Sequence, residues 1–392
     1  MFKKIIDKKI YNNFIENHSC GNALQSWEWG ELKEKFGWQT ERFGFFEKDK
    51  LIGAVQFLSH TFPKYSVVCC ENKWALFKFF PWSLIFCRKV RDLFKKFPSG
   101  FKILYIPRGP VLDFKNENNL KYFLLEIKKI AKEKKADLIR IEPNVINELR
   151  IMNYELRNKL NQEENRSKIN ENFIIQNLKQ NGFQKSKISY QPSDTMVVDL
   201  KKTEQEIWQK ELNKDARYNI RLAERKGVKI REGENEKDVK EFYKLWQKTQ
   251  LRQKISIRSE EYYKKLFSIF PKENVHLFLA QYQEKNIAGL ILLTFGKKAI
   301  YLYAASDYNF HALAPTYFIV WKAILKAKEK GCEIFDFWGV APEGAKKNHP
   351  WQGITTFKQK FCQAKRINYI GAWDFPMSWK YWIFIWLEKI KK

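Results

Sequence analysis

The stretch Val275-His-Leu-Phe-Leu-Ala-Gln-Tyr-Gln-Glu-Lys-Asn-Ile-Ala-Gly-Leu-Ile-Leu-Leu-Thr294 contains two apolar runs separated by four polar residues. Such runs, rich in β-branched and aromatic residues, predict two strands joined by a hairpin turn. A third strand is predicted at Ala299–Ala305. Residues 315–331 are predicted as a helix, because proline is favoured at the first helical position and glycine just after the last. Glu333–Val340 is the last predicted strand of this block.

The same order of elements occurs earlier in the chain. Gln39–Phe46 and Leu51–Leu58 are predicted strands around a polar turn, and Ile103–Val111 is a third. A helix over about residues 118–135 and a strand at Asp137–Glu142 complete this block. Strand, turn, strand, strand, helix, strand is similar to the core order of GNAT acyltransferases. We therefore predict an α/β (α+β) protein of two tandem GNAT-like domains with a cleft between them.

The expected domain boundary follows a polar stretch between the blocks. Domain 1 is expected to span residues 1–190, including an aromatic insertion at 73–97 and a polar segment at 145–172. Domain 2 is expected to span 191–392 and to end in an aromatic tail at 371–392.

The charge of the chain restricts the class of partner. Its 392 residues include 72 Lys and Arg against 44 Asp and Glu, a formal net charge of +28. This excess favours a polyanionic partner, either nucleic acid or an anionic membrane face. The alternative is a lysine-rich codon bias without function. Cysteines and histidines show no metal-ligand spacing, so we expect no metal site and a reducing cytoplasm. The basic N-terminus lacks an apolar run of signal-peptide length, so we expect no export.

Two aromatic stretches, Trp74–Cys87 and Phe375–Leu387, are flanked by Lys and Arg. Both are shorter than the ~20 apolar residues needed to cross a bilayer. Their composition is typical of segments that lie in a membrane interface. Packing against the protein's own core is an equal alternative.

The segment His349–Phe361 contains a lysine, Lys358, between two aromatic residues, Phe357 and Phe361. A lysine held against apolar walls can stabilise negative charge that develops on a reacting carbonyl, because water competes poorly there. The alternative is an ordinary surface lysine on an amphipathic turn.

A basic helix is predicted from the capping box Thr203-Glu-Gln-Glu206 to Gly227. Its cationic residues are spaced 4, 3, 4 and 4 apart and fill one stripe: Lys210, Lys214, Arg217, Arg221 and Arg225. Such a stripe favours phosphate binding. The alternative is a solvated face with intrahelical ion pairs.

Coenzyme A is not expected as a cofactor. GNAT enzymes bind its pyrophosphate on a glycine-rich turn at a helix N-terminus. The corresponding Ser306–Pro315 contains no glycine, and Arg108-Gly-Pro110 in the first block has one glycine followed by proline.

Six motifs in this order resemble the Fem family of peptidoglycan-bridge aminoacyl transferases. They are Gln25–Lys33, Tyr105–Asp113, Lys214–Gly227, Thr249–Arg252, Phe335–Gly339 and Gly353–Lys358. The resemblance covers nearly the whole chain. It departs from the family at Cys362-Gln-Ala364, where small residues are usual.

The resemblance implies transfer of an amino acid from aminoacyl-tRNA to a stem-peptide amine of a peptidoglycan precursor, with no metal or other cofactor. Lys358 would stabilise the tetrahedral intermediate, and Asp113 or Asp374 would accept the amine proton unless substrate or RNA assists instead. Lys33 and Arg217 would bind the precursor diphosphate. Further substrate-binding candidates are Tyr105, Arg108, Arg221, Tyr262 and Phe357.

Two alternatives remain open at this stage. One is an acyl or aminoacyl transferase with another cell-envelope acceptor, such as a lipid or polysaccharide. The other is a non-catalytic protein associated with membrane or RNA. We expect a cytoplasmic protein, peripheral on the inner face of the plasma membrane if its aromatic segments bind lipid. The sequence leaves open the oligomeric state and whether the precursor is nucleotide-linked or lipid-linked.

Overall fold

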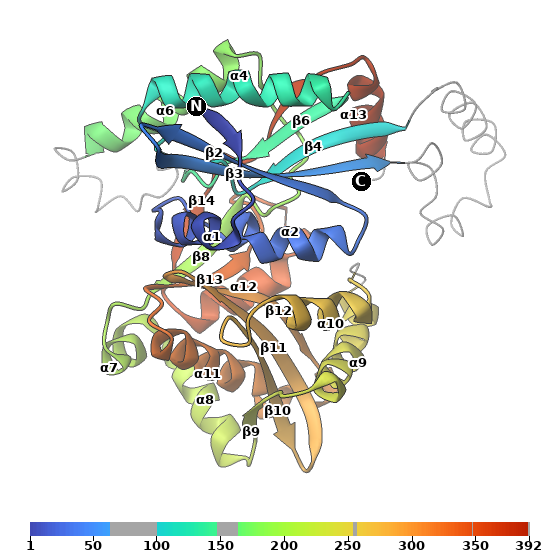
Figure 1. Ribbon diagram of the computed structural model, residues 1–392. Helices are drawn as coiled ribbons and strands as arrows, with labels where there is room; N and C mark the ends of the chain where they lie inside the picture. Colours follow the sequence, from blue (N-terminus) through green and yellow to red (C-terminus); the bar gives the residue numbers. More distant parts are fainter. Residues whose placement is uncertain (63–99, 147–163, 254–256, 347, 391–392) are drawn as a thin grey trace.

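The computed structural model describes residues 1–62, 100–146, 164–253, 257–346 and 348–390. Within these residues the chain forms two twisted sheets, one above the other in Figure 1, with helices on their faces. The predicted insertion at 73–97 and most of the polar segment at 145–172 lie outside the described residues.

The first part of the chain supplies most of the first sheet and its helices. Its elements are β1 (Phe2–Lys4), α1 (Lys8–Asn17), α2 (Trp27–Glu34), β2 (Gln39–Glu47), β3 (Lys50–Phe62), β4 (Phe101–Pro107), β5 (Val111–Leu112), α4 (Glu117–Glu133), β6 (Leu138–Glu142), α6 (Glu164–Gln180) and β7 (Gln184–Lys185).

The second part begins with β8 (Asp194–Asp199), α7 (Glu204–Glu206), a π-helical turn (Ile207–Glu211), α8 (Lys214–Arg225), β9 (Lys229–Glu232), α9 (Glu236–Gln253) and α10 (Glu260–Ile269). It continues with β10 (Val275–Tyr282), β11 (Lys285–Phe295), β12 (Lys298–Ser306), a 3₁₀ turn (Tyr308–Leu313), α11 (Pro315–Glu329), β13 (Ile334–Gly339), α12 (Gln352–Phe361) and β14 (Lys365–Asn368). The chain ends with β15 (Trp373–Pro376) and α13 (Lys380–Ile390).

The two sheets have matching topologies. The first has the order β1-β2-β3-β4-β6-β15-β7, and the second, read from its other edge, has β9-β10-β11-β12-β13-β8-β14. In each sheet a single parallel pair, β4 with β6 and β12 with β13, lies beside antiparallel strands. This pairing confirms the predicted duplication and the α/β class.

The two halves exchange a strand. β8, which follows β7 of the first sheet in the chain, inserts between β13 and β14, while β15, which follows β14 of the second sheet, inserts between β6 and β7. The expected assignment of residues 371–392 to domain 2 therefore differs from the structure, which joins β15 and α13 to the first sheet. The reason is packing: Trp373 of β15 is buried beside Ile139 and Ile141 of β6.

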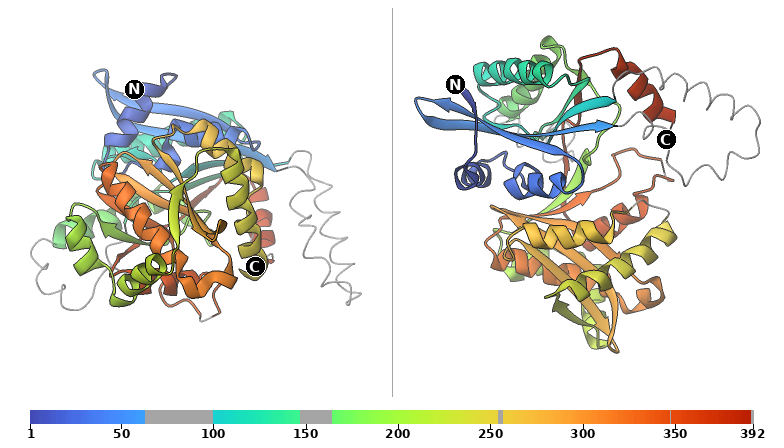
Figure 2. Two further views of the ribbon diagram at one scale, coloured as in Figure 1. Left: turned by 90° about the horizontal axis from the view of Figure 1, so that it is seen from below. Right: turned by 45° about the vertical axis from the view of Figure 1, so that its right-hand side comes forward.

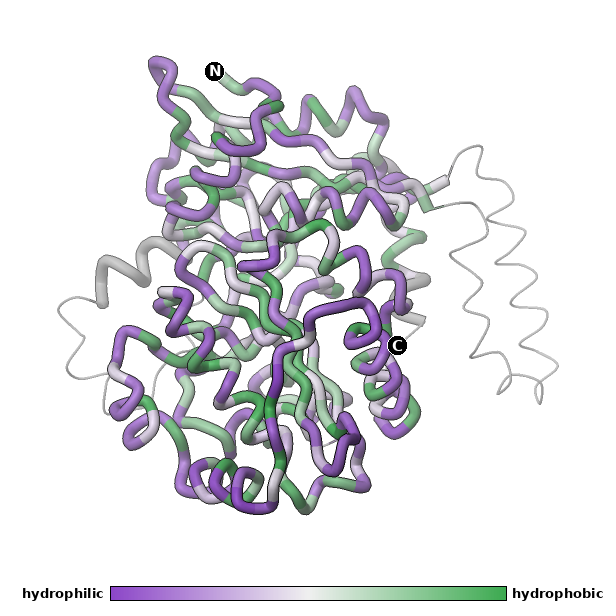
Figure 3. Tube along the Cα trace, turned by 60° about the horizontal axis from the view of Figure 1, so that its bottom comes forward, coloured by the Kyte–Doolittle hydropathy of each residue, from purple (hydrophilic) through white to green (hydrophobic). Residues whose placement is uncertain are grey.

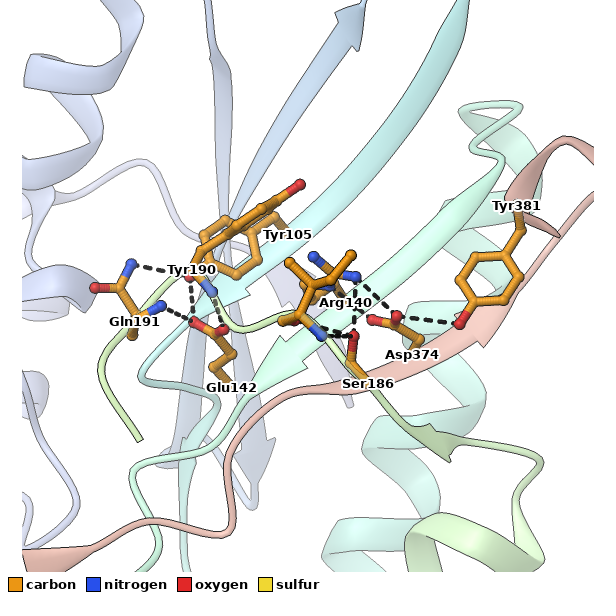
Figure 4. A network of polar contacts seen from close by, with 9 residues as sticks. Tyr105, Arg140, Glu142, Ser186, Tyr190, Gln191, Asp374 and Tyr381 are labelled. Carbon is orange, nitrogen blue, oxygen red and sulfur yellow. Dashed lines mark hydrogen bonds and ion pairs between the residues drawn. The ribbon is translucent and has the colours of Figure 1, made fainter. Parts of the chain in front are cut away.

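A buried ion pair fixes the returning strand. The Arg140 guanidinium of β6 donates to both carboxylate oxygens of Asp374 at 2.7 and 2.8 Å, and both residues have no exposed surface (Figure 4). The Tyr381 hydroxyl donates to the same carboxylate at 3.2 Å. Asp374 is thus a structural partner of Arg140.

Helices cover both faces of each sheet. In the first sheet α4 and α6 pack on one face, and α13 packs on the other against Leu58, Ile103 and Leu138 (Figure 2). In the second sheet α8 and α11 cover one face, and α9 and α10 cover the other. Hydrophilic residues alternate with hydrophobic ones along the outer helices, as amphipathic packing requires (Figure 3).

Helices α1 and α2 lie between the sheets (Figure 1). Their apolar residues Tyr11, Ile15 and Leu32 share one buried cluster with α9, α10 and strands of the second sheet. Gln25, just before α2, holds the first sheet: its amide exchanges hydrogen bonds with the backbone of Gln56 and donates to the Pro107 carbonyl at 2.7 Å. The N-terminal helices therefore form a large part of the contact between the halves.

No helix within the described ranges is both long and apolar enough to cross a membrane.

Asp374→Ala should leave the Arg140 guanidinium buried without its ion-pair partner. We expect it to lower the free energy of unfolding by about 3–5 kcal/mol, measured by urea denaturation. Glu241→Ala is the matched control, because Glu241 forms an exposed pair with Lys244 and its loss should cost less than about 1 kcal/mol. Equal losses for the two variants would contradict the structural role of Asp374.

Candidate functional site

A pocket of about 620 Å³ opens between the two halves of the molecule. It is bounded by α2, β3 and β4 from the first half, by the start of α10 from the second, and by α13. Its lining residues are Trp29, Lys33, Phe36, Trp38, Leu58, Phe62, Tyr105, Pro107, Tyr190, Gln191, Ile257, Arg258, Ser259, Tyr262 and Phe384. Aromatic walls surround two cations, and the described residues that line the pocket include no carboxylate.

Those cations are Lys33 and Arg258. The Lys33 amine lies 4.7 Å from the Trp29 ring centre and 5.4 Å from that of Tyr262, and Arg258 lies 5.6 Å from the same Tyr262 ring. Burial, together with the nearby Arg258 charge, lowers the pKa of Lys33 to about 7. Two cations held together, with no acidic side chain among the described lining residues, suit a doubly charged anion.

One wall of the pocket is held by a buried carboxylate, Glu142 at the end of β6 (Figure 4). It accepts hydrogen bonds from the backbone N–H groups of Tyr190 and Gln191 at 2.6 and 3.0 Å, and from the Tyr105 hydroxyl. Burial raises its pKa, which these donors partly offset. The Gln191 amide donates to the Tyr105 hydroxyl at 3.0 Å. The wall is therefore rigid, and Glu142 positions it without lining the pocket.

Lys358 lies on α12 with only 1% of its surface exposed. Its amine donates to the carbonyls of Gly339 at 2.8 Å and Trp338 at 3.4 Å, and lies 5.4 Å from the Tyr301 ring centre. Burial lowers its pKa to about 7, although the nearby Asp336 carboxylate favours the charged form. The predicted burial of this lysine is confirmed, while its role in catalysis stays a prediction.

A bulge in β13 turns these carbonyls toward the lysine. The register between β13 and β8 shifts between Asp336 and Gly339, and Trp338 has a left-handed backbone with φ of 61°. Its N–H donates to the Asp336 carboxylate at 2.7 Å, which holds this strained turn. The bulge follows the short parallel contact of β12 with β13, beyond which the two strands are no longer paired.

Contacts connect the pocket with Lys358. Arg108, which follows the pocket residue Pro107, is 98% buried: it lies 3.7 Å from the Tyr369 ring centre and 5.7 Å from that of Trp338, and it donates to the Pro192 carbonyl at 2.6 Å. On the other side, the Tyr303 hydroxyl of β12 donates to the Tyr262 hydroxyl at 3.4 Å. Arg108 thus joins the two halves beside the pocket instead of lining it.

Two predicted phosphate ligands lie elsewhere. The helix expected over residues 203–227 is interrupted at Leu212, whose backbone is extended and pairs with Cys362. Arg217 donates to backbone carbonyls of Trp208 and Gln209 at 3.2 and 3.1 Å, and Arg221 is exposed over the Trp208 ring. Neither lines the pocket. The helix is interrupted because Leu212 pairs with Cys362 at the end of α12. The carbonyls of Trp208 and Gln209 accept hydrogen bonds from Arg217 instead.

The remaining candidates are also separated from the pocket. Asp113 is exposed after β5 and accepts from the Lys115 N–H at 2.9 Å. Asp374 is enclosed with Arg140. Phe357 is half-buried against the Tyr317 ring, at 5.1 Å. Of the predicted substrate residues, Lys33, Tyr105 and Tyr262 are brought together in the pocket.

Sequence reasoning missed Arg258. It lies just before Ser259, the N-cap residue of α10, and four residues before Tyr262. A cation beside a predicted helix start and a candidate tyrosine could have indicated a phosphate ligand. The longer cationic stripe of α8 instead favoured a phosphate site on that helix.

The duplicated sheets, with a buried lysine where β12 and β13 stop pairing, fit a GNAT-like acyltransferase. A model of the FemAB family matches residues 6–73, 93–285 and 278–389. The chain belongs to the FemAB family and is a transferase of the acyl and aminoacyl type.

Relatives and a solved structure agree with this assignment. The chain is 23% identical to the lipid II:glycine glycyltransferase of Staphylococcus saprophyticus, over 96% of this chain and 94% of the relative. It is 22% identical to the enzyme of the same name from Staphylococcus aureus, over 96% and 93%. The crystal structure of FemX has a TM-score of 0.74 and 20% identity, over 98% of this chain and 99% of FemX, which confirms the fold.

The low pKa of Lys358 should make stability depend on pH. Below about pH 7 the lysine is protonated in both states. As pH rises from about 7 toward the ordinary value of 10.5, the folded state loses its proton first, so the free energy of unfolding should rise by roughly a few kcal/mol. Lys358→Met should remove this rise in urea denaturation series. Lys360→Met, at an exposed position of the same helix, is the control. A wild-type minus Lys358→Met difference that is constant with pH would contradict the buried, shifted amine.

Proposed function

We propose that this protein transfers an amino acid from aminoacyl-tRNA to an amine on the stem peptide of a peptidoglycan precursor. The proposal depends on Lys358, a buried lysine that donates to the backbone of β13. Arg108 and Trp338 connect it to an aromatic pocket that contains two cations. The names of the glycyltransferase relatives support a precursor of this class as acceptor.

The pocket is proposed to hold the diphosphate part of the precursor. Lys33 and Arg258 would donate charge-assisted hydrogen bonds to its oxygens, and the Trp29 and Tyr262 rings keep competing water away. Diphosphate binding would raise the pKa of Lys33 again, because a nearby anion favours the charged amine.

Lys358 is proposed to stabilise the tetrahedral intermediate. The acceptor nitrogen attacks the ester carbonyl carbon, a C–N bond forms, and the carbonyl oxygen becomes an oxyanion. A charged lysine has three N–H donors; two face the carbonyls of Trp338 and Gly339, which leaves the third for the oxyanion. Collapse of the intermediate breaks the C–O bond, and the tRNA hydroxyl leaves with the proton that the amine has lost.

No protein base is proposed for that proton. Asp374 is paired with Arg140, and Asp113 lies outside the pocket lining. The leaving tRNA oxygen, or a neighbouring group on either substrate, is the proposed acceptor.

The donor is proposed to be aminoacyl-tRNA instead of acyl-CoA. The turn before α11 has no glycine, and its Asp307 carboxylate caps the 3₁₀ turn and pairs with Lys248. α11 then starts with Pro315, which lacks an N–H. In the first half, the Asn116 side chain caps α4, whose first turn contains Glu117. Both helix starts are thus poor sites for a pyrophosphate. The formal charge of +28 also favours RNA as a partner.

Lys358→Met should reduce transfer by about 10²–10³-fold while precursor and tRNA binding stay near the wild-type values, because the oxyanion loses its donor. The assay is mass spectrometry of a lysine-containing muramyl peptide incubated with mixed aminoacyl-tRNAs and, in parallel, with acyl-CoA. Lys360→Met should retain activity. Product from acyl-CoA alone, or loss of binding together with activity in Lys358→Met, would contradict the proposal.

Lys33→Met and Arg258→Met should each weaken binding of a nucleotide-linked precursor roughly 10- to 100-fold, because each removes a charge-assisted hydrogen bond to phosphate. Calorimetry measures this change. Arg217→Met is the matched control: it removes one cation outside the pocket, so it should alter stability more than precursor affinity. If Arg217→Met weakens precursor binding most, the diphosphate site lies on α8 instead.

A further inference from the structure

α13 has two chemically different sides. Tyr381, Phe384 and Ile385 are buried, and they pack on the first sheet in one cluster with Leu58 and Ile103. Three tryptophans around the same helix are exposed instead: Trp379 by 63%, Trp382 by 60% and Trp386 by 42%.

The tryptophans are spaced for one face of a helix. Trp379 lies in the turn that opens α13, where its carbonyl accepts from the Trp382 N–H at 3.2 Å. Intervals of three and four residues then bring Trp382 and Trp386 onto the same side. A contiguous group of exposed tryptophans on a protein surface marks an interaction site.

The chemistry of this face fits an anionic bilayer surface. Tryptophan is enriched at the membrane–water interface, where its ring lies at the level of the head groups. The chain carries a net charge of +28, and the sequence after Trp386 contains three lysines, Lys389, Lys391 and Lys392, against one acidic residue, Glu388. Lys187 is exposed next to Ile188, which packs in the same cluster as Tyr381 and Phe384. Basic residues near a surface helix are attracted by anionic lipids.

The buried side of α13 forms part of the pocket. Phe384 lines it, stacked on Phe101 at 4.3 Å between ring centres and 6.0 Å from the Phe62 ring, which also lines it. One helix thus contributes to the pocket wall on one side and exposes tryptophans on the other. In Figure 2, α13 lies at one end of the first sheet, near the marked C-terminus.

We propose that the Trp379, Trp382 and Trp386 face of α13 docks the protein on an anionic lipid bilayer and places the pocket beside the head groups. A diphosphate anchored in the membrane would then reach Lys33 and Arg258 without leaving the bilayer. This second step rests on the proposed function, whereas the docking itself does not.

Vesicle co-sedimentation of the full chain tests the docking. We expect binding to phosphatidylglycerol-containing vesicles, weaker binding to pure phosphatidylcholine, and a loss of about tenfold or more in Trp382→Gln/Trp386→Gln. Tyr218→Gln is the matched control, because Tyr218 is 61% exposed on α8 and outside this face. Wild-type binding by the double variant, or no binding by the wild-type chain, would overturn the proposal.

Two further measurements cover misfolding and self-association. Brominated lipids should quench part of the wild-type tryptophan fluorescence, a result that needs no variant; absence of quenching overturns the docking. Light scattering without vesicles should give the same mass for the wild type and the double variant. A wild-type dimer that the double variant dissociates would assign the face to a second copy and overturn the proposal.

Transfer assays separate this inference from the proposed function. The double variant should keep wild-type kcat/KM for a soluble nucleotide-linked precursor and lose about tenfold or more for a lipid-linked precursor in vesicles. Equal losses on both acceptors would overturn the role of docking in substrate access. If the wild type modifies neither acceptor, the proposed function fails, and vesicle binding still decides the docking.

Discussion

The reciprocal exchange of β8 and β15 is the constraint on which the rest of the structure depends. Each sheet contains an interior strand that directly follows a strand of the other sheet in the sequence. Neither sheet is therefore complete without the other part of the chain. The Arg140–Asp374 pair fixes one exchanged strand, and the hydrogen bond from the Thr195 hydroxyl to the Asp336 carboxylate lies at the other. The exchange and the buried cluster around α1 and α2 both tie the halves together, and the pocket is built from α2, β4 and α10 where they meet.

The two buried amines of interest, Lys33 and Lys358, differ in their surroundings. Lys33 and Lys358 both have pKa values lowered to about 7 by burial, one in the pocket and one behind the β13 bulge. Lys33 has aromatic rings and Arg258 around it, so an incoming anion is its natural partner. Lys358 instead has carbonyl partners from Trp338 and Gly339, which fix its direction without neutralising it. These surroundings fit the proposed roles: Lys33 in binding an anion, and Lys358 in stabilising a charge that forms during the reaction.

Local patterns predicted the repeating core well. The strand at 275–282 and the helix beginning at Pro315 are where periodicity and cap chemistry place them, and Thr203–Glu206 forms the predicted capping box. The predictions differ from the structure where distant contacts decide. Leu212 breaks the basic helix to pair with Cys362, and β15 joins a strand more than two hundred residues earlier, neither of which a local window contains. The burial of Lys358 was predictable from its aromatic neighbours, whereas the place of Arg258 depends on how α10 meets α2.

The position of β15 has a consequence for biosynthesis. Arg140 and Asp374 are separated by 234 residues, so the first sheet stays open between β6 and β7 until β15 has left the ribosome. Domains of most proteins fold as units while synthesis proceeds from the N-terminus. Here the first sheet is completed only after the strands of the second sheet have been made, and until β15 arrives β6 has an unpaired edge that could pair with another chain.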